Sequence, residues 1–154
     1  MKYVQRVLQP DERVLHAARL HWLIYLKAIL LLVLALVCVV LASGSNEPGI
    51  AITLWVGAVV FGLLGLLSAI TASVRQAATE LVLTDRRVIY KTGLFKRHTM
   101  EMNRSKVETV GVDQSVFGRL LNYGTIIVRG TGGSFEPIRH IDDPLTFRNH
   151  ITAA

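Results

Sequence analysis

The chain has 154 residues, of which 51% are hydrophobic and 18% are charged, and its formal net charge is +6. About a third of the chain lies in two long apolar tracts, so the remainder has room for only one small folded domain. The single cysteine, Cys38, lies within the first tract, which excludes disulfides within the chain and cysteine-based zinc sites. Because the basic residues are not interleaved with aromatic side chains, we do not expect a nucleic-acid partner.

Residues 1–21 are a polar N-terminal segment before the first tract, and we expect this segment to be cytoplasmic. Val4, Val7 and Leu8 have helical spacing, but the stretch around them is too short for a stable isolated helix. Residues 12–20 alternate loosely between apolar and polar side chains and lead directly into the tract. Two interpretations stay open for them, namely a strand added to the folded domain or a segment lying on the membrane surface.

The two apolar tracts, residues 22–42 and 50–72, are separated by a polar loop at residues 43–49. A helix over the first tract would be about 31 Å long, close to the thickness of the hydrocarbon core of a bilayer. A helix packed on a soluble core keeps a polar face, whereas the first tract carries only the charge of Lys27 and the second carries none. The sequence therefore predicts a transmembrane helical hairpin over residues 22–72.

The charges beside the tracts predict how the hairpin is oriented. Basic residues precede the first tract and follow the second, whereas the loop carries only Glu47. Since basic residues concentrate on the cytoplasmic side, we expect both termini in the cytoplasm. The expected anchors at the membrane interface are Trp22, Tyr25, Lys27 and Arg75, with Lys27 snorkelling back to the headgroups.

A cleaved signal peptide is the alternative to a first transmembrane helix, because the small residues Ala42 and Ser43 follow the apolar run. The leader would then be unusually long and would contain Asp11 and Glu12, which disfavours this alternative. Even after cleavage, the second helix would enter from outside and leave the C-terminal domain in the cytoplasm.

The second tract carries small residues on one helix face, spaced by three and four positions: Ala58, Gly62, Gly65, Ala69 and Ala72. Alanines at positions 28, 35 and 42 recur every seven residues in the first tract. Small side chains let another helix backbone approach closely. We favour the interpretation that the two stripes face each other within the hairpin. The alternative is that they face a second copy or a partner subunit.

Residues 76–154 alternate with period two between frequent turn residues, which is typical of an antiparallel β domain. We expect six short strands, near residues 80–84, 87–92, 96–102, 106–113, 124–130 and 134–141. On the second strand, Ile89 is expected on the outward face with Arg87 and Lys91. Pro137 implies an edge position or a bulge in the last strand.

Two non-strand segments are expected in this domain. Residues 114–123 lose the alternation, which indicates a loop with one helical turn. A closing helix follows the last strand, with Asp143 as its N-cap and Pro144 at its first position. Its side chains Leu145, Phe147 and Ile151 are expected to cover one end of the sheet.

Five motifs lie along this region: T-D-x-R at 84–87, K-T-G-L-F at 91–95, K-V-E-x-V at 106–110, Q-S-x-x-G-R at 114–119 and Y-G-T at 123–125. With the leader and hairpin, they resemble the bacterial PH-like domain of small membrane proteins, the bacterial PH domain 2 or DUF304 family. The resemblance implies an α+β membrane protein: a hairpin in the bacterial inner membrane and a small PH-like antiparallel β-barrel or sandwich with a C-terminal capping helix. It implies no reaction, because such folds host lipid, peptide and protein binding alike.

The sequence contains no recognisable catalytic or metal-binding pattern. The five histidines lack the spacing of metal ligands. The stretch 130–133 is not followed by the consecutive lysine and hydroxyl residue of a phosphate-binding loop, and a hairpin turn explains it better. We therefore expect neither enzyme activity nor a cofactor or metal.

A basic cluster is the candidate ligand-binding surface: Arg86, Arg87, Lys91, Lys96 and Arg97. Cations beside an anionic leaflet attract phosphorylated headgroups. The alternative is that these charges lie on the ordinary solvated face of a strand and at its turns. We therefore predict a membrane-anchored binding module that contacts lipid headgroups or a protein partner. The alternative is a non-catalytic scaffolding subunit of an oligomeric or multi-protein membrane assembly, which the small-residue stripe favours.

Overall fold

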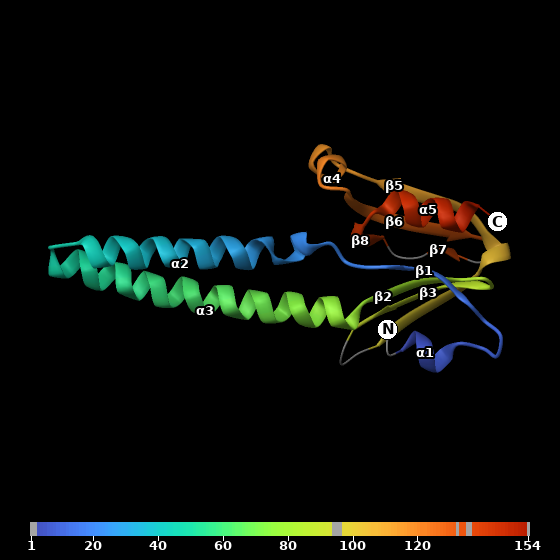
Figure 1. Ribbon diagram of the computed structural model, residues 1–154, viewed down its shortest axis with the longest axis horizontal. Coiled ribbons are helices and arrows are strands. Elements are labelled where there is room, and N and C mark those ends of the chain that lie inside the picture. The colour runs from blue at the N-terminus through green and yellow to red at the C-terminus, as the bar shows by residue number, and fades with distance from the viewer. Residues whose placement is uncertain (1–2, 94–96, 132, 135–136, 154) are drawn as a thin grey trace. The chain divides into compact units, whose positions relative to one another are not determined.

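The computed structural model describes residues 3–93, 97–131, 133–134 and 137–153 (Figure 1). The chain divides into two compact units. One unit is Trp22–Val74, and the other combines Met1–His21 with Arg75–Ala154. The N-terminal segment thus belongs to the same unit as the C-terminal domain.

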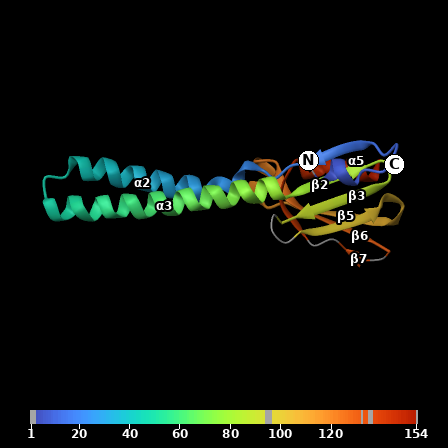
Figure 2. The ribbon, with the colours of Figure 1, turned by 90° about the horizontal axis from the view of Figure 1, so that it is seen from below.

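The first unit is a pair of antiparallel helices that run side by side (Figures 1 and 2). Its elements are the 3-10 helix η1 (Trp22–Tyr25), α2 (Leu26–Gly44) and α3 (Pro48–Ala78), whose last turn extends into the other unit. Both helices are long and apolar enough to cross a membrane. Only 11% of the most apolar stretch of each is buried, whereas the core helix of a soluble protein would be mostly buried.

Small residues line the contact between α2 and α3. The three alanines of the first tract are buried, and Ala58, Gly65 and Ala72 of the second are buried too. A Cβ atom on Gly65 would lie 2.9 Å from Cγ of Leu32, so only glycine allows this approach. Gly62 differs, because a Cβ there would have nothing within 4 Å. These contacts support the interpretation in which the stripes face each other.

The second unit contains two antiparallel sheets. The first sheet has the order β1 (Val14–Ala18), β2 (Glu80–Thr84), β3 (Arg87–Thr92) and β4 (His98–Asn103). Ala17 of β1 lies opposite Val82 of β2. Of the two interpretations of residues 12–20, the strand is therefore confirmed for residues 14–18.

The second sheet is built around one central strand, and Figure 2 shows β5, β6 and β7 side by side. The strands are β5 (Val107–Asp113), β6 (Tyr123–Gly130), β7 (Gly133–Ser134) and β8 (Ile138–Asp142). β6 pairs with β5, β7 and β8. An isolated bridge between Leu20 and Ile141 joins residues beyond β1 to β8. The two sheets do not close, so a barrel is wrong for the described residues.

Three short helical segments complete this unit: the 3-10 helix η2 (Arg104–Lys106), α4 (Val116–Leu120) and α5 (Pro144–Thr152). α5 packs against β1, β5 and β6. Asp143 and Pro144 hold the predicted positions at its start, and Phe147 and Ile151 are buried in the core. Leu145 was expected in the core but is exposed.

The N-terminal segment covers the outer face of the first sheet. The helix α1 (Val4–Val7) buries Val4 against Val82 and Ile89. The carboxylate of Glu80 accepts hydrogen bonds from the backbone N–H groups of Tyr3 and Val4, at 3.3 and 3.1 Å. The expectation of an outward, solvated face around Ile89 is therefore wrong. The N-terminal segment, which is distant in the sequence, covers that face instead.

Candidate functional site

Arg87, in the predicted basic cluster, is bound to two carboxylates. Its Nε donates to Glu12 Oε1 at 2.9 Å and its Nη2 donates to Glu12 Oε2 at 2.8 Å, while its Nη1 donates to Glu101 Oε2 at 2.6 Å. The hydrogen bonds from Arg87 hold the pKa of Glu12 at about 2, below its ordinary 4.5, against the opposing effect of burial. Arg87 therefore offers no open cation to a ligand.

The other four residues of the cluster do not form one open surface either. Lys91 is only 9% exposed, with its Nζ 5.7 Å from the ring centroid of Tyr3. Arg86 and Arg97 are exposed, and Arg86 also donates to the Gln9 amide at 3.3 Å. Lys96 lies outside the described residues. Arg86 and Arg97 stay candidates for a headgroup contact, whereas Arg87 and Lys91 are occupied by the N-terminal segment.

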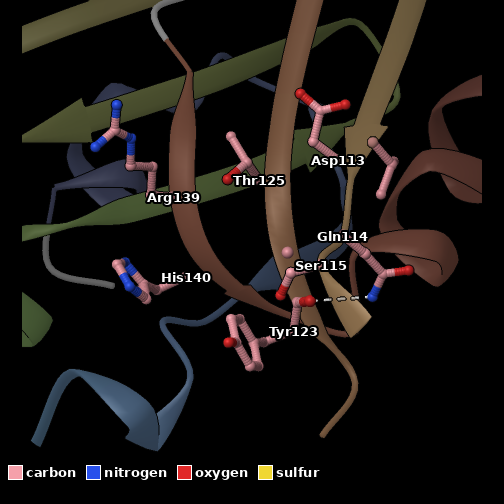
Figure 3. A pocket seen from close by; sticks show the side chains of 9 residues that line it. Asp113, Gln114, Ser115, Tyr123, Thr125, Arg139 and His140 are labelled. Carbon is pink, nitrogen blue, oxygen red and sulfur yellow. Dashed lines mark hydrogen bonds between the residues drawn. The ribbon is translucent and has the colours of Figure 1, made fainter. Parts of the chain in front are cut away.

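A pocket of about 680 Å³ lies elsewhere, where β5, β6 and β8 meet. Figure 3 shows Arg139 and His140 on one side of it and Asp113 and Gln114 on the other. The pocket is lined by Val112, Asp113, Gln114, Ser115, Tyr123, Gly124, Thr125, Arg139 and His140. This lining is rich in hydrogen-bonding groups, and one end of it is formed by the cation of Arg139 and the protonatable side chain of His140.

A bulge in β8 forms the end of the pocket at Arg139 and His140. Gly124 pairs with Ile141 and Ile126 pairs with Ile138, so two residues of β8 lie opposite Thr125 alone. His140 has φ of 61°, in the left-handed region that side chains other than glycine rarely adopt. Its backbone oxygen accepts a hydrogen bond from the His21 N–H at 2.7 Å. The bulge does not include Pro137, which precedes β8. Among the described strands β8 pairs with β6 alone, so the edge position implied by Pro137 is the alternative that fits.

A second pocket, of about 530 Å³, shares Arg139 with the first. Its lining residues are Leu20, Arg75, Thr79, Tyr90, Thr92, Pro137, Ile138 and Arg139. None of these described residues carries a carboxylate, and two of them carry guanidinium groups. Arg139 thus joins the two pockets into one polar surface.

We call Arg75, Arg139 and His140 the cation cluster. The pKa of His140 is lowered by burial first, and then by the positive charges of Arg75 and Arg139 and by His21. Within the described part of the chain, no carboxylate forms an ion pair with either arginine, and the buried Nδ1 of His140 has no hydrogen-bond partner. Bound anionic oxygens would offset this repulsion.

Comparison with known protein families identifies the fold that carries this cluster. A family model described as bacterial PH domain matches residues 13–154. The chain is a bacterial PH domain protein. Neither the curated proteins nor the solved structures include a match to it. Membership in the bacterial PH domain family supports a binding module in general, and it confirms the resemblance seen in the motifs.

The motifs of this bacterial PH domain serve the fold at two places. Thr84 is buried, and its Oγ1 accepts the backbone N–H of Arg87 at 2.9 Å and donates to Glu12 at 2.7 Å. Gln114 Nε2 donates to the backbone oxygen of Tyr123 at 3.0 Å, which ties the chain before α4 to β6 (Figure 3). These residues shape the ends of the strands.

The cation cluster was missed at the sequence level, except that Arg75 was expected as an interface anchor. Arg139 and His140 are consecutive in a strand, where alternation predicts opposite faces. Only the bulge places both in one pocket, and no spacing in the sequence reports it. Of the other expected anchors, Trp22 and Lys27 are exposed, and the Tyr25 hydroxyl lies 3.3 Å from Ser73 Oγ.

Proposed function

We propose that this chain is a membrane-anchored binding module whose cation cluster binds the phosphate of an anionic lipid headgroup. The observation that carries the proposal is the cation cluster itself: three positive or protonatable groups between two pockets, without a carboxylate partner in the described part of the chain. Guanidinium groups are well suited to phosphate because they donate two parallel hydrogen bonds.

The position of Arg75 in the chain supports a lipid as the source of the phosphate. Arg75 follows the end of the second apolar tract at Ala72 by three residues, less than one helical turn. If α3 crosses a membrane, Arg75 lies at the depth of the headgroups. The threonine hydroxyls of the second pocket would supply further hydrogen bonds to phosphate oxygens.

The test is a histidine titration by NMR on the full chain in a neutral detergent. We expect the pKa of His140 to rise when phosphatidylglycerol is added and to stay unchanged with phosphatidylcholine, because a bound anion stabilises the imidazolium. By the same linkage, the lipid should bind more tightly as the pH falls and His140 takes up a proton. The histidine resonance that is missing from the spectrum of the His140→Gln variant is the resonance of His140.

Two arginine variants locate the site. Arg139→Gln should weaken phosphatidylglycerol binding about fivefold, the effect of losing one cation near an anionic surface. Arg97→Gln is the matched control, because Arg97 is exposed and lines neither pocket. If Arg97→Gln weakens binding and Arg139→Gln does not, headgroups bind at the basic cluster predicted from the sequence. If neither lipid shifts the pKa of His140, the proposal is wrong and a protein partner becomes the better candidate.

A further inference from the structure

The helix α4 exposes an apolar surface that the fold does not use. Val116, Phe117 and Leu120 are 76%, 70% and 79% exposed. Single exposed apolar side chains are ordinary, but three large ones within one five-residue helix form a contiguous patch. We call these three side chains the α4 tip. Figure 1 shows α4 beyond the ends of β5 and β6.

The turn that presents the α4 tip is firmly held. Ser115 is the N-cap of α4, and its Oγ accepts the Gly118 N–H at 3.0 Å. A Cβ atom on Gly118 would lie 2.7 Å from the backbone oxygen of Tyr123, so only glycine permits this packing. The polar side and the glycine of the turn therefore face the domain. The apolar side chains are displayed outward by a defined backbone rather than by a loose loop.

The chain connections favour a lipid bilayer as the occupant of this surface. Two short connections join the domain to the hairpin. The connection from β1 to η1 has three residues, Arg19, Leu20 and His21, and the connection from α3 to β2 is Thr79 alone. If the hairpin spans a membrane, the domain is held covalently beside that membrane by two short connections. A bilayer is then an apolar phase to which the domain that carries the α4 tip is always tethered.

The charges around the α4 tip agree with this choice. Residues 114–122 include Arg119, which is exposed, and no Asp or Glu. Large apolar side chains flanked by a cation are the composition that binds at the interface of an anionic leaflet. A carboxylate in this segment would oppose such binding.

We propose that the α4 tip inserts Val116, Phe117 and Leu120 into the interfacial layer of the membrane, with Arg119 at the headgroups. The inference rests on the membrane anchorage in the proposed function, but not on lipid binding by the cation cluster. The domain then contacts the bilayer at a third place, besides the two chain connections to the hairpin.

Depth-dependent fluorescence quenching tests this insertion. In a Cys38→Ala background, which removes the only cysteine, Leu120→Cys receives an environment-sensitive fluorophore and the full chain is reconstituted into vesicles of phosphatidylethanolamine and phosphatidylglycerol. We expect a blue-shifted emission that is quenched by lipids with a spin label near the headgroup. The variant Val116→Ser with Phe117→Ser should lower the ratio of inserted to free tip at least about tenfold, the effect of losing buried apolar side chains.

Two further label positions separate the possible failures. Leu36→Cys on α2, where Leu36 is 62% exposed, should be quenched by deeply placed spin labels, and Glu108→Cys at the exposed start of β5 should not be quenched. If the label at position 36 is not quenched, the membrane anchorage itself is wrong. If it is quenched and the label at position 120 is not, the insertion of the α4 tip is wrong. A blue-shifted label at position 120 without lipid quenching would overturn the inference in favour of a protein contact.

Discussion

Glu12 is the residue that fastens the N-terminal segment to the first sheet. It accepts hydrogen bonds from Arg87, from the hydroxyl of Thr84 and from the backbone N–H of Gln9 at 2.9 Å. Its side chain is fully buried. Because the partners stabilise the carboxylate and not the carboxylic acid, folding holds the pKa of Glu12 at about 2. The stability of this domain should therefore depend on pH, with Glu12 contributing beside Glu80 and Asp143, whose pKa values are also lowered.

The direction of that dependence follows from the lowered pKa. The stabilisation is complete above the ordinary pKa of 4.5 and is lost as the pH falls toward about 2. The loss is on the order of 3 kcal/mol in the free energy of unfolding, since one pKa unit corresponds to about 1.4 kcal/mol. Thermal unfolding of the full chain in mild detergent, followed by near-ultraviolet circular dichroism from pH 6 to pH 2, measures it.

Substitutions assign this pH dependence to Glu12. Glu12→Gln should lower the stability at neutral pH by roughly 3 kcal/mol, because it leaves the buried charge of Arg87 without its main partner, and should flatten the acid-dependent part. Glu101→Gln is the matched control, since Glu101 binds the same guanidinium but is 32% exposed. It should cost less than about 1 kcal/mol. An equal loss in both variants would contradict the central role of Glu12.

At the scale of elements, the two glycines of the stripe on α3 should behave differently. Gly65 packs against Leu32, whereas Gly62 has open space around it. Gly65→Leu should therefore destabilise the hairpin by on the order of 1 to 2 kcal/mol, and Gly62→Leu should leave it unchanged. Unfolding in a denaturing-detergent titration measures the difference.

The same pair of variants tests for a second copy or a partner subunit. If Gly62 faces another protein, Gly62→Leu will lower the native mass in mild detergent without destabilising the hairpin. An unchanged mass, together with unchanged stability, means that Gly62 faces lipid. Equal destabilisation by both variants would contradict the difference in packing between the two glycines.

Local patterns predicted the elements of this chain well, because alternation and turn residues report strands directly. β2, β3 and β5 lie within a residue of their expected positions, and α5 begins at Pro144 as expected. What failed depends on contacts between distant residues. Ile89 was placed on a solvated face because nothing near it in the sequence reveals that Val4 covers it.

The candidate site was less predictable than the fold for the same reason. Basic residues close together in sequence suggested a surface, but Arg87 is bound by Glu12, which lies in another part of the chain. Arg75 and Arg139, which are far apart in the sequence, instead line one pocket. The spacing of basic residues along the sequence does not show which of them are paired with carboxylates, nor where a strand bulges. The cation cluster could therefore be found only from the structure.

At the scale of the whole molecule, one strand pairing constrains the topology. β1 precedes the first apolar helix and β2 follows the second, yet Ala17 pairs with Val82 in one sheet. If the hairpin crosses a membrane, both of its ends must therefore lie on the same side, which requires an even number of crossings. Cleavage of a signal peptide after Ala42 would remove β1 from the sheet, so the pairing also disfavours that alternative.

The flanking charges then predict the side of the membrane on which the domain lies. Lys2, Arg6, Arg13 and Arg19 precede the hairpin and Arg75 follows it, whereas the loop carries Glu47 and no cation. Because basic flanks are retained in the cytoplasm, a reporter fused after Ala154 should be active only in the cytoplasm, and one inserted at Ser45 only outside. Alkaline phosphatase and a fluorescent protein, which are active on opposite sides, serve as paired reporters at each position. If both positions report the same side, the hairpin does not cross the membrane. If the two sides are exchanged, the basic flanks do not set the orientation, and the cation cluster would face the outer leaflet.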